Sequence, residues 1–142
     1  MTQSLPIIQI QKVSKRFGDF EVLREVDLEV YPGETLVIIG RSGVGKSTIL
    51  KHMAGLLSPD SGKVIVQGLE INHLSEEQLN ELRKKMGVVF QYAALFDSLT
   101  VFENIAFRLL RDFKMPREKA LEVAKEKLEL VGLKHGILNR KP

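Results

Sequence analysis

The sequence contains no cysteine and no tryptophan, and aromatic residues make up only 6% of its 142 residues. Without cysteine, the chain has neither a disulfide framework nor a thiolate metal site. Its three histidines, His52, His73 and His135, lack the spacing of metal ligands, so we expect all three to be surface or interface residues. Disulfide-stabilised scaffolds and zinc-thiolate proteins are thereby excluded as classes.

Long apolar runs are also absent. No run approaches the length of a membrane span, and the first ten residues, "MTQSLPIIQI", lack the basic segment of a signal peptide. A hydrophobic content of 44% is nevertheless enough for one domain of ordinary size with a buried core. We therefore expect a soluble, cytoplasmic α/β chain.

The net charge of +3 is modest but uneven. Residues 108–142 carry ten Lys/Arg and five Asp/Glu, whereas the residues before them carry eleven and thirteen. Such an excess suits an acidic partner or a phospholipid surface, but acidic residues alternate with lysines in "PREKALEVAKEKLELVGL", so we favour a solvated helix face. Nucleic-acid binding is not supported, because no aromatic residues alternate with the basic ones and no reader motif is present.

The stretch "GRSGVGKST", Gly40 to Thr48, has the spacing G-x-x-x-x-G-K-[ST] of a phosphate-binding loop (P-loop). Glycines allow the backbone N–H groups to point inward, and the helix that follows directs its positive end to the same place. Lys46 would reach the β- and γ-phosphates, the Ser47 hydroxyl would bind Mg²⁺, and Thr48 is the next phosphate contact. A plain strand-to-helix turn is the alternative, but the apolar strand and helix on either side favour a nucleotide site.

Alternating and β-branched patterns predict several strands. "IIQIQKVS" and "FEVLREVDLEV" flank the turn "RFGD" and are typical of antiparallel strands. Further strands are expected over residues 35–39, over 63–67, and over 87–90, where the last would be a buried parallel strand that ends at Gln91.

Helical spacing predicts four helices. The first begins near Lys46 and runs to about Leu57. The second begins with Ser75 and Gln78 as a capping box, with Leu74 and Leu79 as a hydrophobic staple. The last two cover 101–111 and 117–131, with apolar faces that include the following residues: Val101, Ile105, Leu109, Leu121, Ala124, Leu128 and Val131.

The order of these pieces resembles the ATP-binding-cassette (ABC) transporter ATPases over the whole chain. The resemblance is carried by "KRFGDFEVLREVDLEVYPGE", "IIGRSGVGKSTILKHMAGLLSPDSGKVIVQG" and "MGVVFQYAALFDSLTVFENIAF". It implies an α/β P-loop fold with an N-terminal antiparallel β subdomain (1–34), a P-loop core (35–92), and the Q-loop with part of a helical subdomain (93–142).

The same resemblance implies functional residues. Phe17 would stack on adenine, and Lys46 and Gln91 would be catalytic, with Gln91 contacting Mg²⁺ and the attacking water. The cofactors would be ATP and Mg²⁺, with the metal held by Ser47 and Gln91, and the nucleotide would be bound by Gly40, Ser42, Gly43, Val44, Gly45, Lys46, Ser47 and Thr48. A turn-packing aromatic and a strand-end polar residue are the alternatives for Phe17 and Gln91, and the P-loop favours the functional roles.

In the family, two subunits form a homodimer that sandwiches two ATP molecules, and a transmembrane permease docks on the segment after the Q-loop. The chain would then lie on the cytoplasmic face of the inner membrane. "FQYAALFDSLTVFENIAFRLL" is most similar to lipid-trafficking ATPases of the Mla, or toluene-tolerance, type. ATPases of amino-acid or metal importers share much of this pattern, and a P-loop kinase or a non-catalytic nucleotide-binding module also stays open.

Three family motifs are not found in this sequence: the L-S-G-G-Q signature, a strand ending in Asp-Glu, and the switch histidine. "AALFD" imitates the second, but Ser98 follows Asp97. We therefore expect a chain cut after Pro142 that binds nucleotide without efficient hydrolysis. Its sheet would lack its centre, leaving residues 35–39 and 87–90 with unpaired edges that repack, associate with a second copy or are partly disordered.

Overall fold

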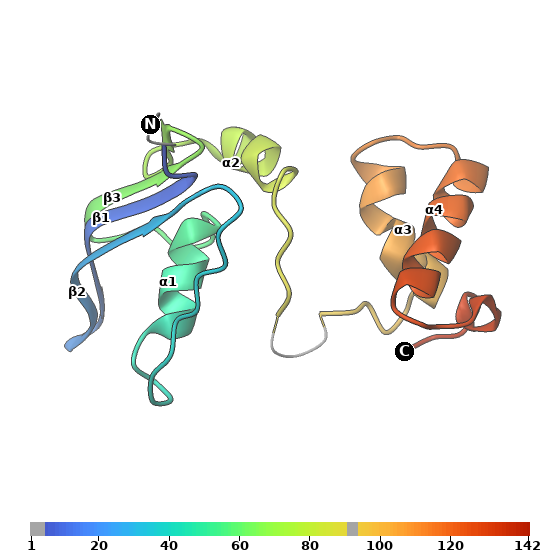
Figure 1. Cartoon of the computed structure of the whole chain (residues 1–142), viewed down its shortest axis with the longest axis horizontal. Helices are drawn as coiled ribbons and strands as arrows, with labels where there is room; N and C mark the ends of the chain where they lie inside the picture. Colours follow the sequence, from blue (N-terminus) through green and yellow to red (C-terminus); the bar gives the residue numbers. More distant parts are fainter. Residues whose placement is uncertain (1–4, 91–93) are drawn as a thin grey trace. The chain divides into compact units, whose positions relative to one another are not determined.

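The computed structural model describes residues 5–90 and 94–142, and the chain divides into two units, Met1–Val89 and Phe90–Pro142 (Figure 1). The first unit contains a small sheet and two helices, and the second contains a pair of helices and a short 3-10 turn.

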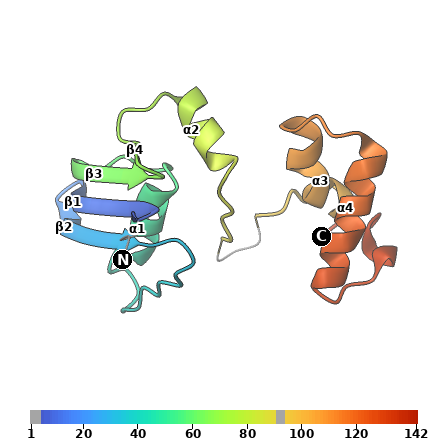
Figure 2. The ribbon, with the colours of Figure 1, turned by 45° about the horizontal axis from the view of Figure 1, so that its top comes forward.

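The sheet of the first unit has four strands in the order β2-β1-β3-β4, and every neighbouring pair is antiparallel (Figure 2). The strands are β1 (Ile8–Phe17), β2 (Phe20–Val30), β3 (Ser61–Val66) and β4 (Leu69–Glu70). The predicted antiparallel pair around the turn "RFGD" is confirmed, from Ile8 opposite Val30 to Phe17 opposite Phe20. The two-residue β4 was not expected, because so short a strand has no pattern of its own.

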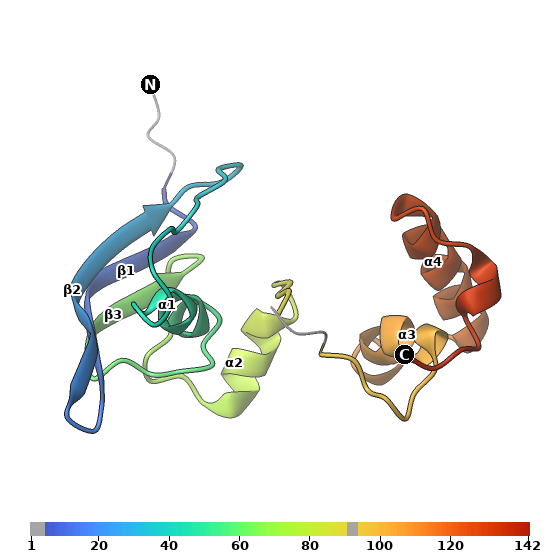
Figure 3. The same cartoon turned by 90° about the horizontal axis from the view of Figure 1, so that it is seen from below.

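Helix α1 (Lys46–Met53) packs against this sheet (Figure 3). The core of the first unit is built from Ile10, Val13, Leu23, Met53, Val64, Val66, Ile71, Leu79 and Leu82. The helix ends earlier than the predicted Leu57, because Gly55 adopts a left-handed φ of +64° and closes a Schellman turn. Arg83 then donates to the carbonyl oxygens of Ala54 and Gly55 at 3.3 and 2.5 Å, so the end of α1 is fixed by a side chain 28 residues further along.

Helix α2 (Glu76–Arg83) supplies that arginine and begins with the predicted capping box. The Ser75 hydroxyl accepts from the backbone N–H of Gln78 at 3.3 Å, and the Gln78 side chain accepts from the backbone N–H of Ser75 at 3.0 Å. Leu74 and Leu79 both join the core of the first unit, as the staple requires.

Two predicted strands do not form. Residues 35–39 and 87–90 have no regular secondary structure. Val37, Ile39 and Val89 are 71%, 86% and 99% exposed, whereas Ile38 packs against the core of the first unit. An apolar run becomes a strand only when a neighbouring strand takes up its backbone hydrogen bonds. Among the described residues, the sheet contains only β1 to β4, and neither segment joins it.

The second unit consists of α3 (Val101–Arg111), α4 (Arg117–Leu130) and the 3-10 turn η1 (His135–Ile137). Its core is formed by Phe102, Ala106, Ala120, Ala124, Leu128 and Leu138. A capping box of Thr100 and Glu103 starts α3. Val131, expected on the apolar face of α4, is 67% exposed because α4 ends one residue before it. None of the helices formed by the described residues is long and apolar enough to cross a membrane.

Candidate phosphate-binding site

Helix α1 differs from α2 and α3 in how its N-terminus is satisfied. Its N-cap residue, Gly45, provides no side-chain hydrogen bond, and its first turn contains no acidic residue. By contrast, capping boxes on Ser75 and Thr100 start α2 and α3, and acidic residues lie in their first turns. The helix of residues 117–130 also lacks a side-chain cap, but Glu118 lies in its first turn. The first N–H groups of a helix carry partial positive charge, so the start of α1 is suited to an anion from outside the helix.

Gly45 also fixes the loop against the sheet. It is buried, and a Cβ atom built on it would lie 2.9 Å from Cδ2 of Leu23 and 3.0 Å from the backbone oxygen of Val22, both on β2. Its φ of +99° is strained for any residue with a side chain. Gly43, at φ +82°, has nothing within 4 Å of the same position. The base of the loop is therefore packed, while its outer turn is open.

Lys46, the first residue of α1, turns its side chain back onto this loop. Its Nζ donates to the carbonyl oxygens of Gly40 and Arg41 at 2.9 and 2.6 Å. An ammonium group has three N–H donors, so these two contacts leave one for a further acceptor. The structure thus brings a positive charge and an uncapped helix start to one loop.

The other predicted loop residues remain accessible. Ser42 and Ser47 are exposed, Thr48 is half-buried, and Val44 is 52% exposed. The exposed Ser47 hydroxyl fits Mg²⁺, which commonly takes one or two protein oxygens and completes its shell with phosphate oxygens and water. Within residues 5–90 and 94–142, no group of three or more His, Cys, Asp or Glu side chains could hold a metal ion. The Ser47 hydroxyl is thus the protein oxygen in this loop that suits Mg²⁺.

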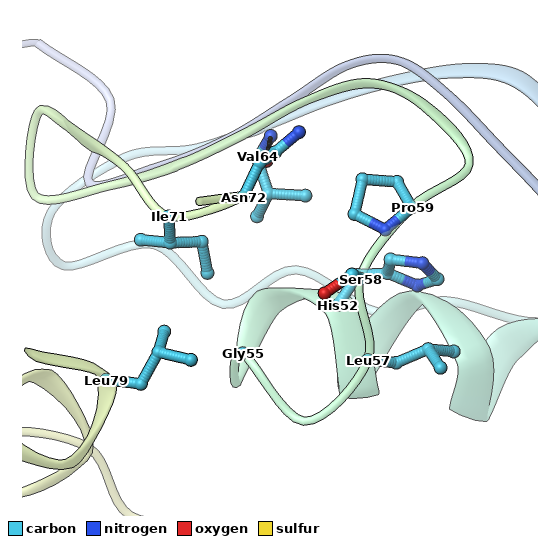
Figure 4. A pocket seen from close by; sticks show the side chains of 9 residues that line it. All are labelled: His52, Gly55, Leu57, Ser58, Pro59, Val64, Ile71, Asn72 and Leu79. Carbon is cyan, nitrogen blue, oxygen red and sulfur yellow. Dashed lines mark hydrogen bonds between the residues drawn. The ribbon is translucent and has the colours of Figure 1, made fainter. Parts of the chain in front are cut away.

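His52 corrects a prediction, because it is fully buried and not a surface residue. Its Nδ1 lies 2.7 Å from the carbonyl oxygen of Thr48, which can only accept, so Nδ1 carries the proton. Its Nε2 is buried and has no hydrogen-bond partner among the residues that the structure describes. The ring lines a cavity of about 10 Å³ with Ser58 and Asn72 among its walls (Figure 4). The spacing of His52 with Ile49 and Met53 would have indicated this buried face.

Phe17 ends β1 at the tip of the hairpin. Its side chain is 51% exposed, and the Lys15 ammonium lies 5.8 Å from the ring centroid. The strand pair that carries Phe17 also reaches the loop. Lys15 on β1 is opposite Leu23 on β2, and Leu23 packs beneath Gly45. An accessible aromatic ring therefore belongs to the same strand pair that supports the P-loop.

Gln91 lies outside the described residues. Of the apolar residues that follow it, Leu95 and Phe96 are half exposed, Leu99 is half-buried, and Phe102 is buried in the core of the second unit.

Asn104 was missed by sequence reasoning, and it holds Phe96 in place. Its Oδ1 accepts from the Phe96 N–H at 2.8 Å, and its Nδ2 donates to the Phe96 carbonyl at 3.1 Å. The Phe96 ring then lies 4.9 Å from that of Phe107, centroid to centroid. No local pattern could have revealed this contact, because a helical asparagine eight residues away makes it.

Comparisons with known proteins agree on one family. The model described as ABC transporter matches residues 23–142. The chain is 45% identical, over 96% of its length, to the chloroplast protein TRIGALACTOSYLDIACYLGLYCEROL 3 of Arabidopsis thaliana. It is 41% identical, over 92%, to the methionine import ATP-binding protein MetN of Brucella abortus. It spans only 39% and 35% of the lengths of these two relatives.

Among solved structures, the chain resembles the dimeric ATP-binding cassette MJ0796 in a post-hydrolysis state bound to ADP and Pi. The TM-score is 0.87 and the sequence identity is 32%. The match covers 95% of this chain and 61% of that one. Likeness therefore extends over both described units.

Proposed function

This chain belongs to the ABC transporter family, and from that premise we propose that residues 40–48 bind the phosphates of Mg-ATP. Its fold is the N-terminal part of the P-loop cassette, with an antiparallel β sheet, the P-loop helix and helices of the helical subdomain. The observation that carries the proposal is the uncapped start of α1 behind a glycine that packs on β2.

Each residue of the site has a chemical role in this proposal. The backbone N–H groups at the start of α1 donate to phosphate oxygens. The Lys46 ammonium exchanges its hydrogen bonds to the Gly40 and Arg41 carbonyls for hydrogen bonds to a phosphate. Ser47 holds Mg²⁺, which neutralises the phosphate charge, and Phe17 stacks on the adenine. Lys46 and Gln91 serve ATP hydrolysis in the whole protein.

We further propose that the whole protein works as a homodimer on the cytoplasmic face of the membrane and couples ATP hydrolysis to a permease. Leu95 and Phe96 support the docking segment after Gln91, because they expose apolar surface. Phe102 belongs to the core instead, so the permease would contact only the first part of this segment.

The substrate class we propose for the whole protein is a lipid, of the kind handled by ATPases of the Mla type. Two points support it: the similarity of "FQYAALFDSLTVFENIAFRLL" and a relative whose name contains that of a galactolipid. The methionine importer among the relatives supports amino-acid import as the second candidate. The rate of ATP hydrolysis by the whole protein, reconstituted with its permease, distinguishes the two candidates. Added phospholipid should stimulate hydrolysis by a lipid transporter, and added methionine should stimulate hydrolysis by a methionine importer.

Calorimetry with Mg-ATP tests the nucleotide site. Lys46→Ala should weaken binding at least tenfold, because the lost ammonium faces a polyanion. Lys51→Ala is the matched control, since Lys51 is an exposed lysine in the last turn of the same helix and should leave the affinity unchanged. Equal affinities for the wild type and Lys46→Ala would contradict the site.

Pull-down with the permease tests the docking segment in the whole protein. Phe96→Glu should abolish permease association and leave ATP binding unchanged. Loss of folding would instead show that the Phe96–Phe107 ring contact is needed for the second unit, and the docking assignment would be withdrawn.

A further inference from the structure

Some positive charges of the second unit lie beside acidic partners. On α4, Lys125 pairs with Glu122 at 2.8 Å, and Lys127 with Glu126 at 2.9 Å. His135 lies 2.9 Å from Glu129. This helix therefore has the solvated, charge-balanced face that its sequence predicts.

The turn between α3 and α4 is different. Here Arg108, Arg111, Phe113 and Lys114, which we call the basic turn, are all exposed, and the Phe113 side chain is 54% exposed. Arg108 has an acidic partner, Asp112, at 3.5 Å. In the part of the chain that the structure describes, Arg111 and Lys114 form no ion pair. The turn thus carries part of the C-terminal charge excess, and the rest lies after α4 at Lys134, Arg140 and Lys141.

The backbone of the turn is tied to the end of α3. The N–H groups of Asp112 and Phe113 both donate to the Arg108 carbonyl, at 2.9 and 3.2 Å, and Met115 N–H donates to the Leu109 carbonyl at 2.9 Å. Figure 1 shows this short connection at one end of the helix pair. Phe113 is therefore held at the surface by fixed backbone contacts, with the Arg108 guanidinium 6.0 Å from its ring centroid.

We propose that the basic turn binds the surface of a membrane that contains anionic phospholipid. An exposed aromatic ring among cations is the arrangement of an interfacial anchor: the ring enters the boundary between headgroups and acyl chains, and the cations bind lipid phosphates. The turn presents one ring on a short helix connection. An acidic peptide is bound by a cluster of arginines, and such binding does not call for an exposed aromatic ring. These features favour a lipid surface over a protein partner.

Co-sedimentation of the 142-residue chain with vesicles tests this proposal. Vesicles of phosphatidylcholine alone should not bind it, and vesicles that also contain phosphatidylglycerol should. Each cation near an anionic surface contributes about fivefold in affinity, so Arg111→Gln with Lys114→Gln should weaken binding about 25-fold. Phe113→Ser should weaken it about tenfold through the lost apolar contact, even with all cations present.

The matched control removes the same charge from α4. Lys125→Gln with Lys127→Gln should weaken binding less than twofold, because these lysines are already paired. Equal losses for the two double variants would show that diffuse charge attracts the chain and would overturn the proposal. Binding to polyglutamate but not to vesicles would overturn it in favour of an acidic protein partner. Lys46→Ala should bind vesicles normally, so failure here is distinguishable from failure of the nucleotide site. Circular dichroism of each variant checks that it folds.

Discussion

Two separate substitutions, Gly45→Ala and Gly43→Ala, each add one methyl group to the loop. The difference in their free energies of unfolding measures how tightly the loop packs on the sheet. In Gly45→Ala the new Cβ would meet Cδ2 of Leu23 at 2.9 Å and the Val22 carbonyl at 3.0 Å. The leucine side chain can move, but the carbonyl belongs to β2 and cannot move without disturbing the strand. In Gly43→Ala the same methyl group would meet nothing within 4 Å.

The two substitutions share one cost and differ in the other. Both place alanine at a positive φ, +99° at Gly45 and +82° at Gly43, which costs about 1–3 kcal/mol. Only Gly45→Ala adds overpacking, which costs another 1–3 kcal/mol or so. We therefore expect Gly45→Ala to lower the free energy of unfolding by about 2–6 kcal/mol, and Gly43→Ala by about 1–3 kcal/mol.

Urea unfolding of the 142-residue chain measures both values, and calorimetry with Mg-ATP measures the effect on the site. The difference between the variants isolates the contact with β2, because the backbone cost largely cancels. If Gly43→Ala and Gly45→Ala destabilised the chain equally, the packing of the loop on β2 would be refuted as the reason for glycine at position 45.

Three further variants test other contacts. His52→Leu removes a buried nitrogen that has no partner among the described residues, and it also removes the hydrogen bond to Thr48. The free energy of unfolding should therefore be unchanged or up to about 2 kcal/mol higher, and a lower value in urea unfolding would refute this. Asn104→Ala should cost about 1–2 kcal/mol and speed amide exchange at Phe96, whose N–H it leaves without an acceptor; unchanged exchange would refute the clamp. The pKa of Asp60 is lowered, first by the hydrogen bond from Lys15 and then by one from a backbone N–H. Its carboxylate therefore adds stability above about pH 4, and this stability is lost as the pH falls through the lowered pKa. Asp60→Asn should make the free energy of unfolding fall less steeply as the pH is lowered, and an unchanged slope would refute the pairing.

Features with short-range causes could be predicted from residues alone. The capping boxes at Ser75 and Thr100 lie within three residues of their partners, and the bounds of α3 follow from local spacing and a cap. The P-loop belongs to the same class, because its glycines and Lys46 need only the adjoining helix to create an anion site.

Tertiary contacts decided the features that depend on distant partners. Residues 35–39 have the composition of a strand, yet strand formation needs a neighbour, and none of the described strands pairs with them. His52 has a polar side chain, yet it is buried because its face of α1 packs on the sheet. Among the described residues, the Thr48 carbonyl is the hydrogen-bond partner of Nδ1, and Nε2 has none.

The sequence by itself determined the chemistry of the proposed nucleotide site, because the order of glycine, lysine and serine before a helix is that of a phosphate-binding loop. Only the tertiary structure decided which charges stay available. Lys125 and Lys127 of α4 find acidic partners three residues away or next to them, whereas among the described residues Arg111 and Lys114 form no ion pair, and the Arg108 guanidinium lies 6.0 Å from the centroid of the exposed Phe113 ring. Charge counts along a chain are additive, but whether a charge is paired depends on the geometry that brings two side chains within about 4 Å.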